Sequence, residues 1–386
     1  MTTILYLHTT SEIGGSDVSL VRLVEGLDRS RYAVIVALPS DGPLVSRLRA
    51  AGARVEIMPV LMKLTSRRGI GFLMRFALNY PRAIAALVRL IRRERVSIVH
   101  TNTIHNLYGV TAAQVARVPH VWHFREIVWQ SGVLRRVELT MARWWSTRII
   151  VTSNAIAGMY GPERRWPIQL VRVPNGVETD RFIPGDGARV RGELQVAPGQ
   201  SLVGIVCRLD AWKGLDDFLE AAALVAVADH DAVFAVIGGP IIGQEPYEDA
   251  LKIRARDLGL GARVRFAGWR YGPTEMPDVH RALDVLVLAS REPEPFGLVL
   301  LEAMATGKPV VATAHGGPLD IVEDGRTGDL VPPRDPAAMA RAIIALLRDP
   351  ARCARIGAHA RERVVQRYTA EQYVAGVEAV YRELVA

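Results

Sequence analysis

The stretch SREPEPFGLVLLEAMATGKPVVAT, residues 290–313, decides the fold of the carboxyl-terminal half of this chain. The apolar strand 285–290 leads into it, and a helical pattern runs from about Phe296 to Gly307, a residue suited to a C-cap. The strand PVVAT, 309–313, follows. A strand, a helix and a strand in this order predict a parallel sheet, which binds ligands beyond the carboxyl ends of its strands.

Two carboxylates stand out in this stretch, because Glu294 and Glu302 lie on either side of the apolar run Leu298–Leu301. A glycosidase needs its two carboxyls about 5 to 9.5 Å apart. The helix from Phe296 to Glu302 already spans about 9 Å, and the preceding loop adds more. The pair is therefore better spaced to grip two ends of one elongated ligand. The simpler alternatives are that Glu294 complements the helix dipole and that Glu302 lies on a solvated stripe.

Short apolar runs alternate with longer helical patterns along the whole chain, which indicates parallel α/β layers. The predicted strands of the first half are 4–8, 33–38, 55–60, 97–101, 120–124 and 148–153. Those of the second half are 202–206, 232–238, 264–268, 285–290, 309–313 and 328–332. Turn residues fill the segment 173–185 between the two sets. We expect two doubly wound domains with a cleft between them.

The amino-acid composition excludes several classes of protein. With 386 residues, 49% of them hydrophobic, the chain can bury a large core. The first residues predict a strand and not a signal peptide, and no apolar run reaches the roughly 18 residues of a membrane span. Two isolated cysteines, Cys207 and Cys353, argue against a disulfide framework and favour a reducing cytosol.

Charge divides the chain in the same place as the strand pattern. Residues 1–175 hold 24 Lys and Arg against 10 Asp and Glu, whereas residues 176–386 hold 24 against 30. The first half therefore favours an anionic partner such as a lipid surface or a phosphorylated acceptor. Its most basic part, residues 61–95, contains nine Lys and Arg and one acid among apolar residues. This pattern predicts either a helix on an anionic membrane or a helix packed on the sheet with its basic face in water. No recognised nucleic-acid motif accompanies the charge.

Cations and helix amides converge at the carboxyl edge of the second predicted sheet. Arg208 follows the first strand, and Lys213 comes five residues later, before Gly214. Arg and Lys side chains can clamp a diphosphate. The amides near Gly297 to Val299, at the start of a helix, can bind the same group.

The first half offers weaker candidates. Gly14 and Gly15 allow a close backbone approach to a ligand, but neither a dinucleotide fingerprint nor a P-loop is present. His123 and Arg125 fall on one face of a predicted strand, near its carboxyl end. Asp229-His230-Asp231 imitates a metal motif, but it precedes a strand and so lies at the opposite edge of the sheet, which favours a solvated turn.

The chain resembles the family-four retaining glycosyltransferases of the GT-B fold. The resemblance rests on EPFGLVLLE (294–302) with GKPVVAT and the following GG (307–317), and on three further matches. These are RLDAWKG (208–214), PNGVETDRF (174–182) and EDGRTGDLVPPRDPAAMARAI (323–343).

The resemblance implies two Rossmann-like, doubly wound parallel-sheet domains facing a central cleft. Residues 1–175, completed by the helix 369–386, would bind the acceptor, and residues 176–368 would bind a nucleoside-diphosphate-sugar donor, UDP- or GDP-linked. The acceptor would be a lipid-linked or cell-envelope glycan precursor. No metal and no other cofactor is expected. The protein would be cytoplasmic, with possible peripheral attachment to the inner face of the plasma membrane through residues 61–95.

The same resemblance assigns roles to individual residues. Glu302 would bind the ribose and Glu294 the donor sugar, while Arg208 and Lys213 would neutralise the diphosphate. The other implied donor-binding residues are Gly14, Gly15, Trp269, Arg270, Phe296, Gly297, Leu298 and Val299. The family often has a histidine where this chain has Arg125, so either Arg125 or His123 would fill the catalytic position of the first domain.

Two other functions share this architecture. A non-hydrolysing nucleotide-sugar 2-epimerase would alter the donor sugar without an acceptor. A non-catalytic glycan- or nucleotide-binding protein would lack turnover. The intact set of Arg208, Lys213, Glu294 and Glu302 weighs against the binding protein.

Overall fold

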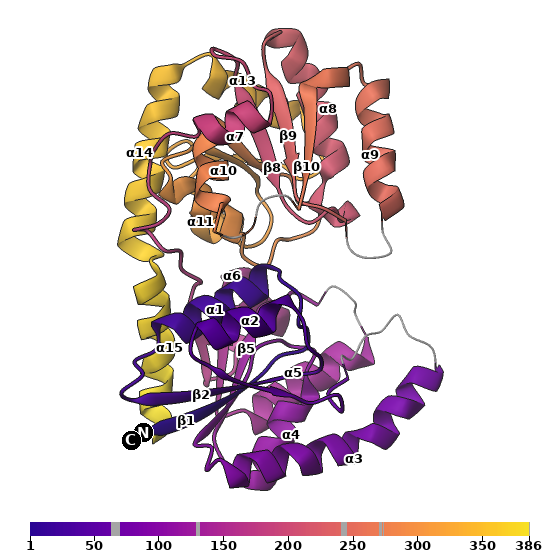
Figure 1. Ribbon diagram of the computed structural model, residues 1–386, viewed down its shortest axis with the longest axis vertical. Helices are drawn as coiled ribbons and strands as arrows, with labels where there is room; N and C mark the ends of the chain where they lie inside the picture. Colours follow the sequence, from indigo (N-terminus) through magenta and orange to yellow (C-terminus); the bar gives the residue numbers. More distant parts are fainter. Residues whose placement is uncertain (63–69, 129–131, 241–244, 270–271, 273, 386) are drawn as a thin grey trace. The chain divides into compact units, whose positions relative to one another are not determined.

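The computed structural model describes residues 1–62, 70–128, 132–240, 245–269, 272 and 274–385 (Figure 1). The chain forms two compact units. Unit 1 consists of Met1–Asn175 and Ala370–Ala386, and unit 2 of Gly176–Thr369. Each unit is built around one parallel sheet.

The sheet of unit 1 has seven strands in the order β3-β2-β1-β4-β5-β6-β7. They are β1 (Thr2–Leu7), β2 (Tyr32–Leu38), β3 (Arg54–Ile57), β4 (Ile98–Thr101), β5 (His120–Phe124), β6 (Arg148–Val151) and β7 (Leu170–Arg172). All neighbours pair in parallel. The sequence predicted the first six. It missed the three-residue edge strand β7.

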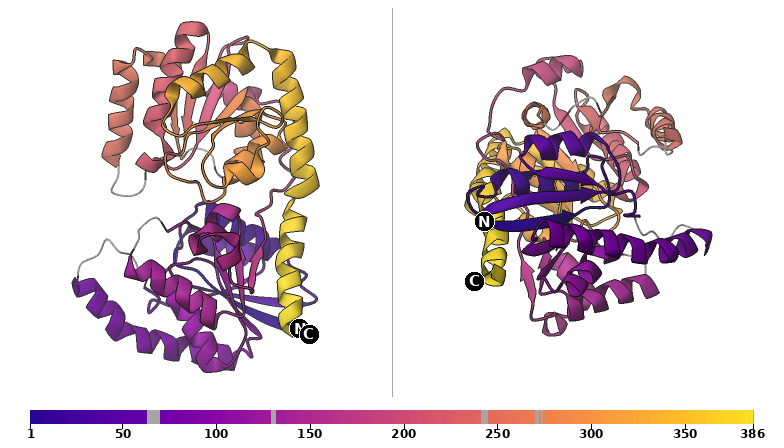
Figure 2. Two further views of the ribbon diagram at one scale, coloured as in Figure 1. Left: turned by 180° about the vertical axis from the view of Figure 1, so that it is seen from behind. Right: turned by 60° about the horizontal axis from the view of Figure 1, so that its bottom comes forward.

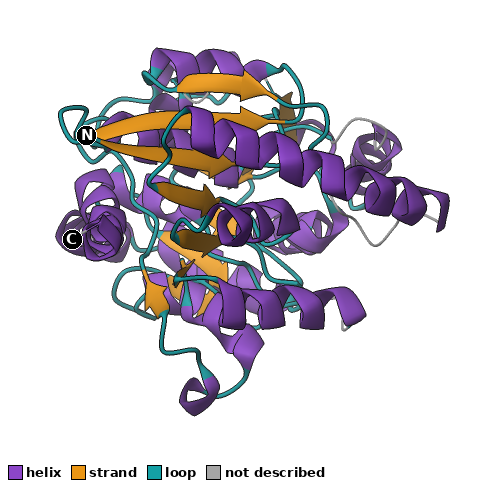
Figure 3. Cartoon of the chain, turned by 90° about the horizontal axis from the view of Figure 1, so that it is seen from below, coloured by secondary structure: helices purple, strands orange, loops and turns teal. Residues whose placement is uncertain are grey.

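Helices cover both faces of this sheet (Figure 3). One face carries α1 (Gly15–Gly26), α2 (Pro43–Ala50) and α15 (Ala370–Val385). The other carries α3 (Ile70–Arg93), α4 (Leu107–Ala116) and α5 (Val133–Trp145). The short α6 (Asn154–Ala157) follows β6. Right-handed crossovers explain why the helices divide between the two faces. The chain first runs from β1 in the middle of the sheet to β3 at one edge, and it then crosses to β4 beside β1 and runs in the opposite direction to β7 at the other edge.

The carboxyl-terminal helix α15 completes unit 1, and its end lies beside the first strand (Figures 1 and 2). The hydroxyls of Tyr6 and Tyr381 are 2.6 Å apart, and that of Tyr381 is 2.6 Å from Nδ1 of His100. Gly26 and Gly376 have no room for a Cβ, because it would lie 2.6 Å from Val374 and 2.8 Å from Val173 respectively. The helix therefore packs closely against both α1 and the sheet.

Unit 2 repeats the scheme with six parallel strands in the order β10-β9-β8-β11-β12-β13. They are β8 (Leu202–Val206), β9 (Val233–Ile237), β10 (Val264–Gly268), β11 (Val285–Leu288), β12 (Val310–Thr313) and β13 (Asp329–Val331). All six strands predicted from the sequence are present, with ends that differ by at most two residues.

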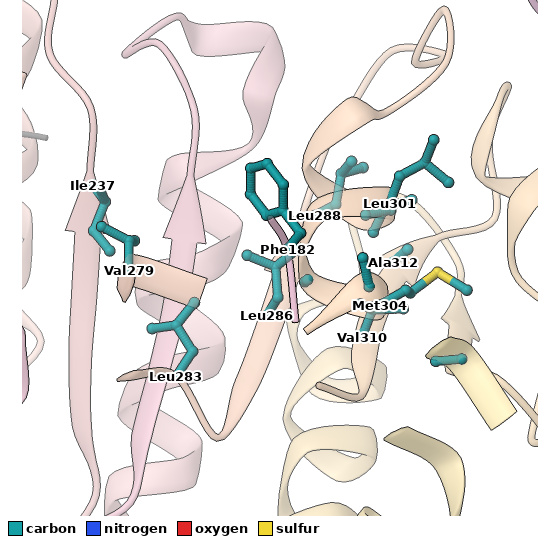
Figure 4. Packing of buried hydrophobic residues seen from close by; sticks show 14 of the residues in the cluster. Phe182, Ile237, Val279, Leu283, Leu286, Leu288, Leu301, Met304, Val310 and Ala312 are labelled. Atoms are coloured by element: carbon teal, nitrogen blue, oxygen red, sulfur yellow. The ribbon is translucent and has the colours of Figure 1, made fainter. Parts of the chain in front are cut away.

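The helices of unit 2 form two layers around this sheet. One layer holds α8 (Leu215–Ala228), α9 (Glu245–Asp257) and α13 (Pro336–Leu347). The other holds α10 (Met276–Ala282), α11 (Leu298–Ala305) and α14 (Pro350–Arg367). Two shorter helices, α7 (Ala188–Glu193) and α12 (Pro318–Ile321), lie in the connections. In the second layer Leu286 and Val310 of the sheet pack beside Leu301 and Met304 of α11 (Figure 4).

None of the helices in the described parts of the chain combines the length and the apolar character that crossing a membrane requires.

We expect acid to destabilise unit 1, because it buries three histidines completely: His100, His120 and His123. Burial lowers the pKa of His120 to about 3. Burial and the charge of Arg125 hold the pKa of the other two well below the usual value. In the unfolded chain all three titrate near pH 6.5. Below that pH the unfolded state therefore binds protons that the folded state does not, and the free energy of unfolding falls.

Each histidine contributes a slope of at most about 1.4 kcal/mol per pH unit, so the three together give at most about 4. Urea denaturation at pH 7, 6 and 5 measures this slope. In the variant His120→Gln about a third of the slope should disappear. A free energy of unfolding that is flat between pH 7 and 5 would contradict the prediction.

Candidate active site

Two residues predicted from the sequence form an ion pair at the carboxyl edge of the sheet in unit 2. The Nζ atom of Lys213 lies 3.0 and 2.8 Å from the two carboxylate oxygens of Glu294. Ser290, just after β11, donates its hydroxyl to the same carboxylate at 2.7 Å. Glu294 is buried, so the lysine and the serine together replace the water that its charge has lost.

Glycines bring the loops of this edge together. A Cβ on Gly214 would lie 2.0 Å from the carbonyl oxygen of Ala289, and one on Gly316 would lie 2.3 Å from that of Glu294. Both glycines have a positive φ, 71° and 87°. The Glu294 backbone also accepts a hydrogen bond from the N–H of Gly317 at 2.7 Å and donates one to the carbonyl of His315 at 3.1 Å. The carboxylate is thus fixed through its own main chain.

Arg208 lies at the same edge of the sheet, but its side chain is much more exposed than that of Glu294. Its side chain is 48% exposed, and its polar contact among the described residues is a 3.4 Å approach to Asp210. The neighbouring Lys213 has its Nζ atom 3.9 Å from the ring centre of Trp212. The guanidinium of Arg208 therefore keeps donors available for an anion.

Helix α11 begins at Leu298, two residues later than the sequence predicts, and Gly297 is its N-cap with φ of 103°. The side chain of Phe296 is buried in the core, so this residue offers only its main chain to a ligand. Leu298 and Val299 are partly buried and pack against the same core. The amides at the start of α11 remain the groups that can bind an anion here.

Glu302 lies inside α11 and is mostly buried. One of its carboxylate oxygens is 3.3 Å from Nε2 of His280, a fully buried residue of α10. The sequence did not single out His280. It is a lone histidine in a helical pattern, and nothing in that pattern shows which neighbour it meets.

An exposed aromatic ring lies over the carboxyl ends of β9 and β10. Trp269 follows β10, and a Cβ on Gly239 would lie only 2.3 Å from its ring. The indole N–H donates to the carbonyl of Pro240 at 3.3 Å. Arg270, which the sequence placed beside it, lies outside the described residues.

In unit 1, Arg125 uses all five of its N–H groups inside the protein. Its Nε donates to Asn102, and its two terminal nitrogens donate to Ser19, Asn175, His123 and Tyr373. These five bonds are 2.5 to 3.3 Å long. Because a guanidinium has five N–H donors and no acceptor, no donor is left for a substrate in this arrangement.

His123 is equally enclosed. Its Nδ1 lies 3.3 Å from a terminal nitrogen of Arg125, and its ring is 5.4 Å from that of His100. Within the described chain its Nε2 is buried without a hydrogen-bond partner. A contact of His123 or Arg125 with a sugar stays a prediction, and the observed geometry gives both an anchoring role.

The glycine loop, Gly14 and Gly15, begins helix α1. Gly14 is the N-cap, and its N–H donates to the carboxylate of Asp17 at 2.7 Å. Asp17 also contacts His8, which directly follows β1. His8 and Asn102 were not predicted as site residues, although both directly follow a strand, as Arg208 nearly does, at the carboxyl edge where ligands bind.

Two further features lie away from this site. Asp229 and Asp231 form an exposed turn before β9, and no group of three or more metal-binding side chains occurs in the described chain. A surface cavity of about 690 Å³ lies at the opposite edge of the unit 2 sheet. It is lined by Lys308, whose pKa is lowered by burial, and by residues of α14.

Two family models match the chain. Residues 13–181 match Glycosyltransferase Family 4, and residues 188–363 match Glycosyl transferases group 1. A D-inositol 3-phosphate glycosyltransferase of Acidothermus cellulolyticus is 33% identical over 302 residues, which are 76% of this chain and 64% of that protein. A GDP-mannose-dependent phosphatidylinositol monomannoside mannosyltransferase of Mycolicibacterium smegmatis is 36% identical over 219 residues, 54% of each chain. The chain thus spans less than two thirds of the length of these curated relatives.

Solved structures agree over the full length. The structure of Anabaena HepE with UDP and glucose has a TM-score of 0.86 at 25% identity, and the match covers all of both chains. The glycosyltransferase WaaG, at 18% identity and a TM-score of 0.71, shows the same fold. These matches confirm the GT-B architecture of two Rossmann-like domains. The chain belongs to the family-four glycosyltransferases of the GT-B fold.

Proposed function

We propose that this protein is a retaining glycosyltransferase that moves a sugar from a nucleoside-diphosphate donor to a hydroxyl acceptor without a metal. The observation that carries the proposal is the grouping of Lys213, Glu294 and Arg208 beside the first amides of α11. Cations and helix amides suit a diphosphate, and a buried carboxylate beside them suits sugar hydroxyls. Support also comes from HepE, which was solved with UDP-glucose.

In this proposal the protein acts mainly on the leaving group. As the glycosidic bond breaks, negative charge grows on the diphosphate, and Arg208, Lys213 and the amides of α11 stabilise it. Glu294 orients the donor sugar, while Glu302, held by His280, binds the ribose. Trp269 lies at the carboxyl ends of neighbouring strands, where it and Arg270 would contact the base. Gly14 and Gly15 would also bind the donor.

We propose a lipid-linked or cell-envelope glycan precursor as the acceptor. The first half of the chain carries an excess of basic residues, which favours a phosphorylated or membrane-bound molecule. The curated relatives named above act on an inositol phosphate and on a phosphatidylinositol mannoside. We expect this chain to bind an acceptor of the same anionic kind.

We propose further that unit 1 docks on an anionic membrane, with the protein on the cytoplasmic side. Helix α3 exposes Met74 and Leu78 together with a row of arginines. The adjacent residues 63–69 lie outside the described residues. Helix α5 lies on the same face of the sheet and exposes Val133, Val137 and Trp144, which are spaced four and seven residues apart and so share one helix face. Apolar side chains flanked by arginines suit a lipid surface.

We expect the substitution Arg208→Ala to slow sugar transfer about 100-fold, since one cation contributes about 3 kcal/mol to the transition state. A thermal-shift screen with UDP, GDP and ADP sugars identifies the donor, and transfer to a lipid-linked glycan fraction measures turnover. Arg254→Ala is the matched control, because Arg254 is similarly exposed but belongs to the outer helix α9.

An Arg208→Ala protein with full activity would contradict the assignment. Incubation of the wild-type protein with the donor alone separates the other functions. An epimerase would convert the donor sugar without an acceptor. A binding protein would give a thermal shift with the donor, but it would form no product with or without an acceptor.

The glycine contact that fixes Glu294 gives a second prediction. Gly316→Ala adds a Cβ that would lie 2.3 Å from the Glu294 carbonyl oxygen, so the loop and its carboxylate must move. Gly325→Ala is the control, because Gly325 also has a positive φ, 70°, but nothing lies within 4 Å of its Cβ. Both variants should lose about 1 kcal/mol of stability from the strained backbone. Only Gly316→Ala should lose donor affinity, at least tenfold by calorimetry. Equal donor affinity in the two variants would argue against the role of this contact.

Membrane docking gives a third prediction. Wild-type protein should co-sediment with vesicles that contain anionic phospholipid, and added salt should weaken the binding. The double variant Leu78→Ala, Trp144→Ala should bind less, because it removes exposed apolar area from both helices. Val227→Ala changes a residue of unit 2 that is 75% exposed, compared with 72% for Leu78, and should bind as the wild type does. Equal binding to neutral vesicles would contradict the anionic preference.

A further inference from the structure

A chain of buried hydrogen bonds leads from Arg125 to the glycine loop. The Nε of Arg125 donates to Oδ1 of Asn102 at 2.8 Å. The Nδ2 of Asn102 lies 3.2 Å from Nδ1 of His8, and Nε2 of His8 contacts Oδ1 of Asp17. The other carboxylate oxygen of Asp17 accepts the N–H of Gly14 at 2.7 Å. All four side chains of this relay are at least 93% buried.

The arginine determines the direction of every bond in the relay. A guanidinium can only donate, so Asn102 must turn its oxygen toward Arg125 and its NH₂ toward His8. His8 must then accept at Nδ1 and carry its proton on Nε2. From Nε2 it donates to Asp17, whose second oxygen stays available for Gly14. The opposite His8 tautomer would place a lone pair against the carboxylate.

The ends of the relay carry opposite charges. In the part of the chain that the structure describes, Arg125 makes no direct ion pair, and the relay joins it to the buried carboxylate of Asp17 through two neutral side chains. Buried charges are costly unless hydrogen bonds or a counter-charge compensate them. This compensation opposes any rotation of Asn102 that would reverse the relay.

We propose that Arg125 is a positioning residue for the glycine loop. It fixes the orientation of Asn102 and the tautomer of His8, and so holds the Asp17 carboxylate where it binds Gly14. The inference rests on the proposed function, in which Gly14 and Gly15 bind the donor. Arg125 acts on the donor through this loop and does not touch it.

The last link is tested with Asp17→Asn, which keeps the size of the side chain. The new amide can still accept from His8 through its oxygen, but its NH₂ then faces the N–H of Gly14, and two donors repel. We expect the dissociation constant for the donor to rise about tenfold. Calorimetry with UDP-glucose and GDP-mannose measures it, using whichever the wild type binds more tightly.

Ser19→Ala is the matched control. Ser19 accepts a bond from Arg125 at 2.8 Å but lies outside the relay. This variant disturbs the arginine and leaves Asn102, His8 and Asp17 in place, so its donor affinity should stay within about twofold of the wild type. An Asp17→Asn protein with wild-type donor affinity overturns the proposal, as does an equal loss in both variants.

The tautomer of His8 gives a readout that stability alone would not change. In protein labelled with ¹⁵N-histidine, the signals of His8 are assigned by their absence from His8→Gln. We expect a neutral ring protonated at Nε2. In Asn102→Asp the side chain offers oxygens to both neighbours, so His8 should be protonated at both nitrogens. A wild-type ring protonated at Nδ1 overturns the proposal.

These readouts separate failure of the inference from failure of the proposed function. Wild-type protein that binds neither nucleotide sugar would contradict the function. The histidine signals need no nucleotide, and the amide shift of Gly14 in Asp17→Asn reports directly whether the loop has lost its bond. An unchanged Gly14 shift would overturn the positioning role even if the donor binds.

Discussion

The arrangement of the segments of unit 1 depends on one buried guanidinium, that of Arg125. Arg125 joins the end of β5 to α1 through Ser19, to the end of β4 through Asn102, and to α15 through Tyr373. Its bond to Asn175 reaches the last residue before the chain enters unit 2, and Tyr373 lies soon after the chain returns. These segments are far apart in sequence, and the planar fork with its five donors holds them at fixed angles. The same charge keeps the neighbouring His100 and His123 neutral, since it adds to the effect of burial on their pKa.

In unit 2 the buried carboxylate of Glu294 is compensated in a different way. Here Lys213 and Glu294 meet directly, and glycines rather than a polar relay bring their loops together. Removing one partner of such a pair would leave an uncompensated charge at a buried position. The two units therefore share a topology but not a way of stabilising the carboxyl edge of the sheet. In unit 1 the edge is locked by side chains, and in unit 2 it is locked by close main-chain contacts that leave Arg208 open to solvent.

The sequence predicted the parts of this structure that are encoded locally. Strands such as β8 and β9 were predicted because buried parallel strands are continuous apolar runs. The ion pair of Lys213 with Glu294 was not predicted, although both residues were, because their meeting depends on the order of β8 and β11 in the sheet. The enclosure of Arg125 was missed for the same reason. Its partners come from four other segments, and no pattern within one segment reveals them.

The ion pair in unit 2 also bears on which ligands this edge can accept. A diphosphate that binds Lys213 would compete with Glu294 for the same ammonium group, and the carboxylate would lose part of its compensation. Among the described residues, Ser290 would then be the side-chain donor that remains to it. A sugar attached to the diphosphate can replace the lost bonds with its own hydroxyls, whereas a free nucleotide cannot. Under the proposed function, this competition would favour an intact nucleotide sugar over the nucleoside diphosphate that remains after transfer, and it would help to release that product.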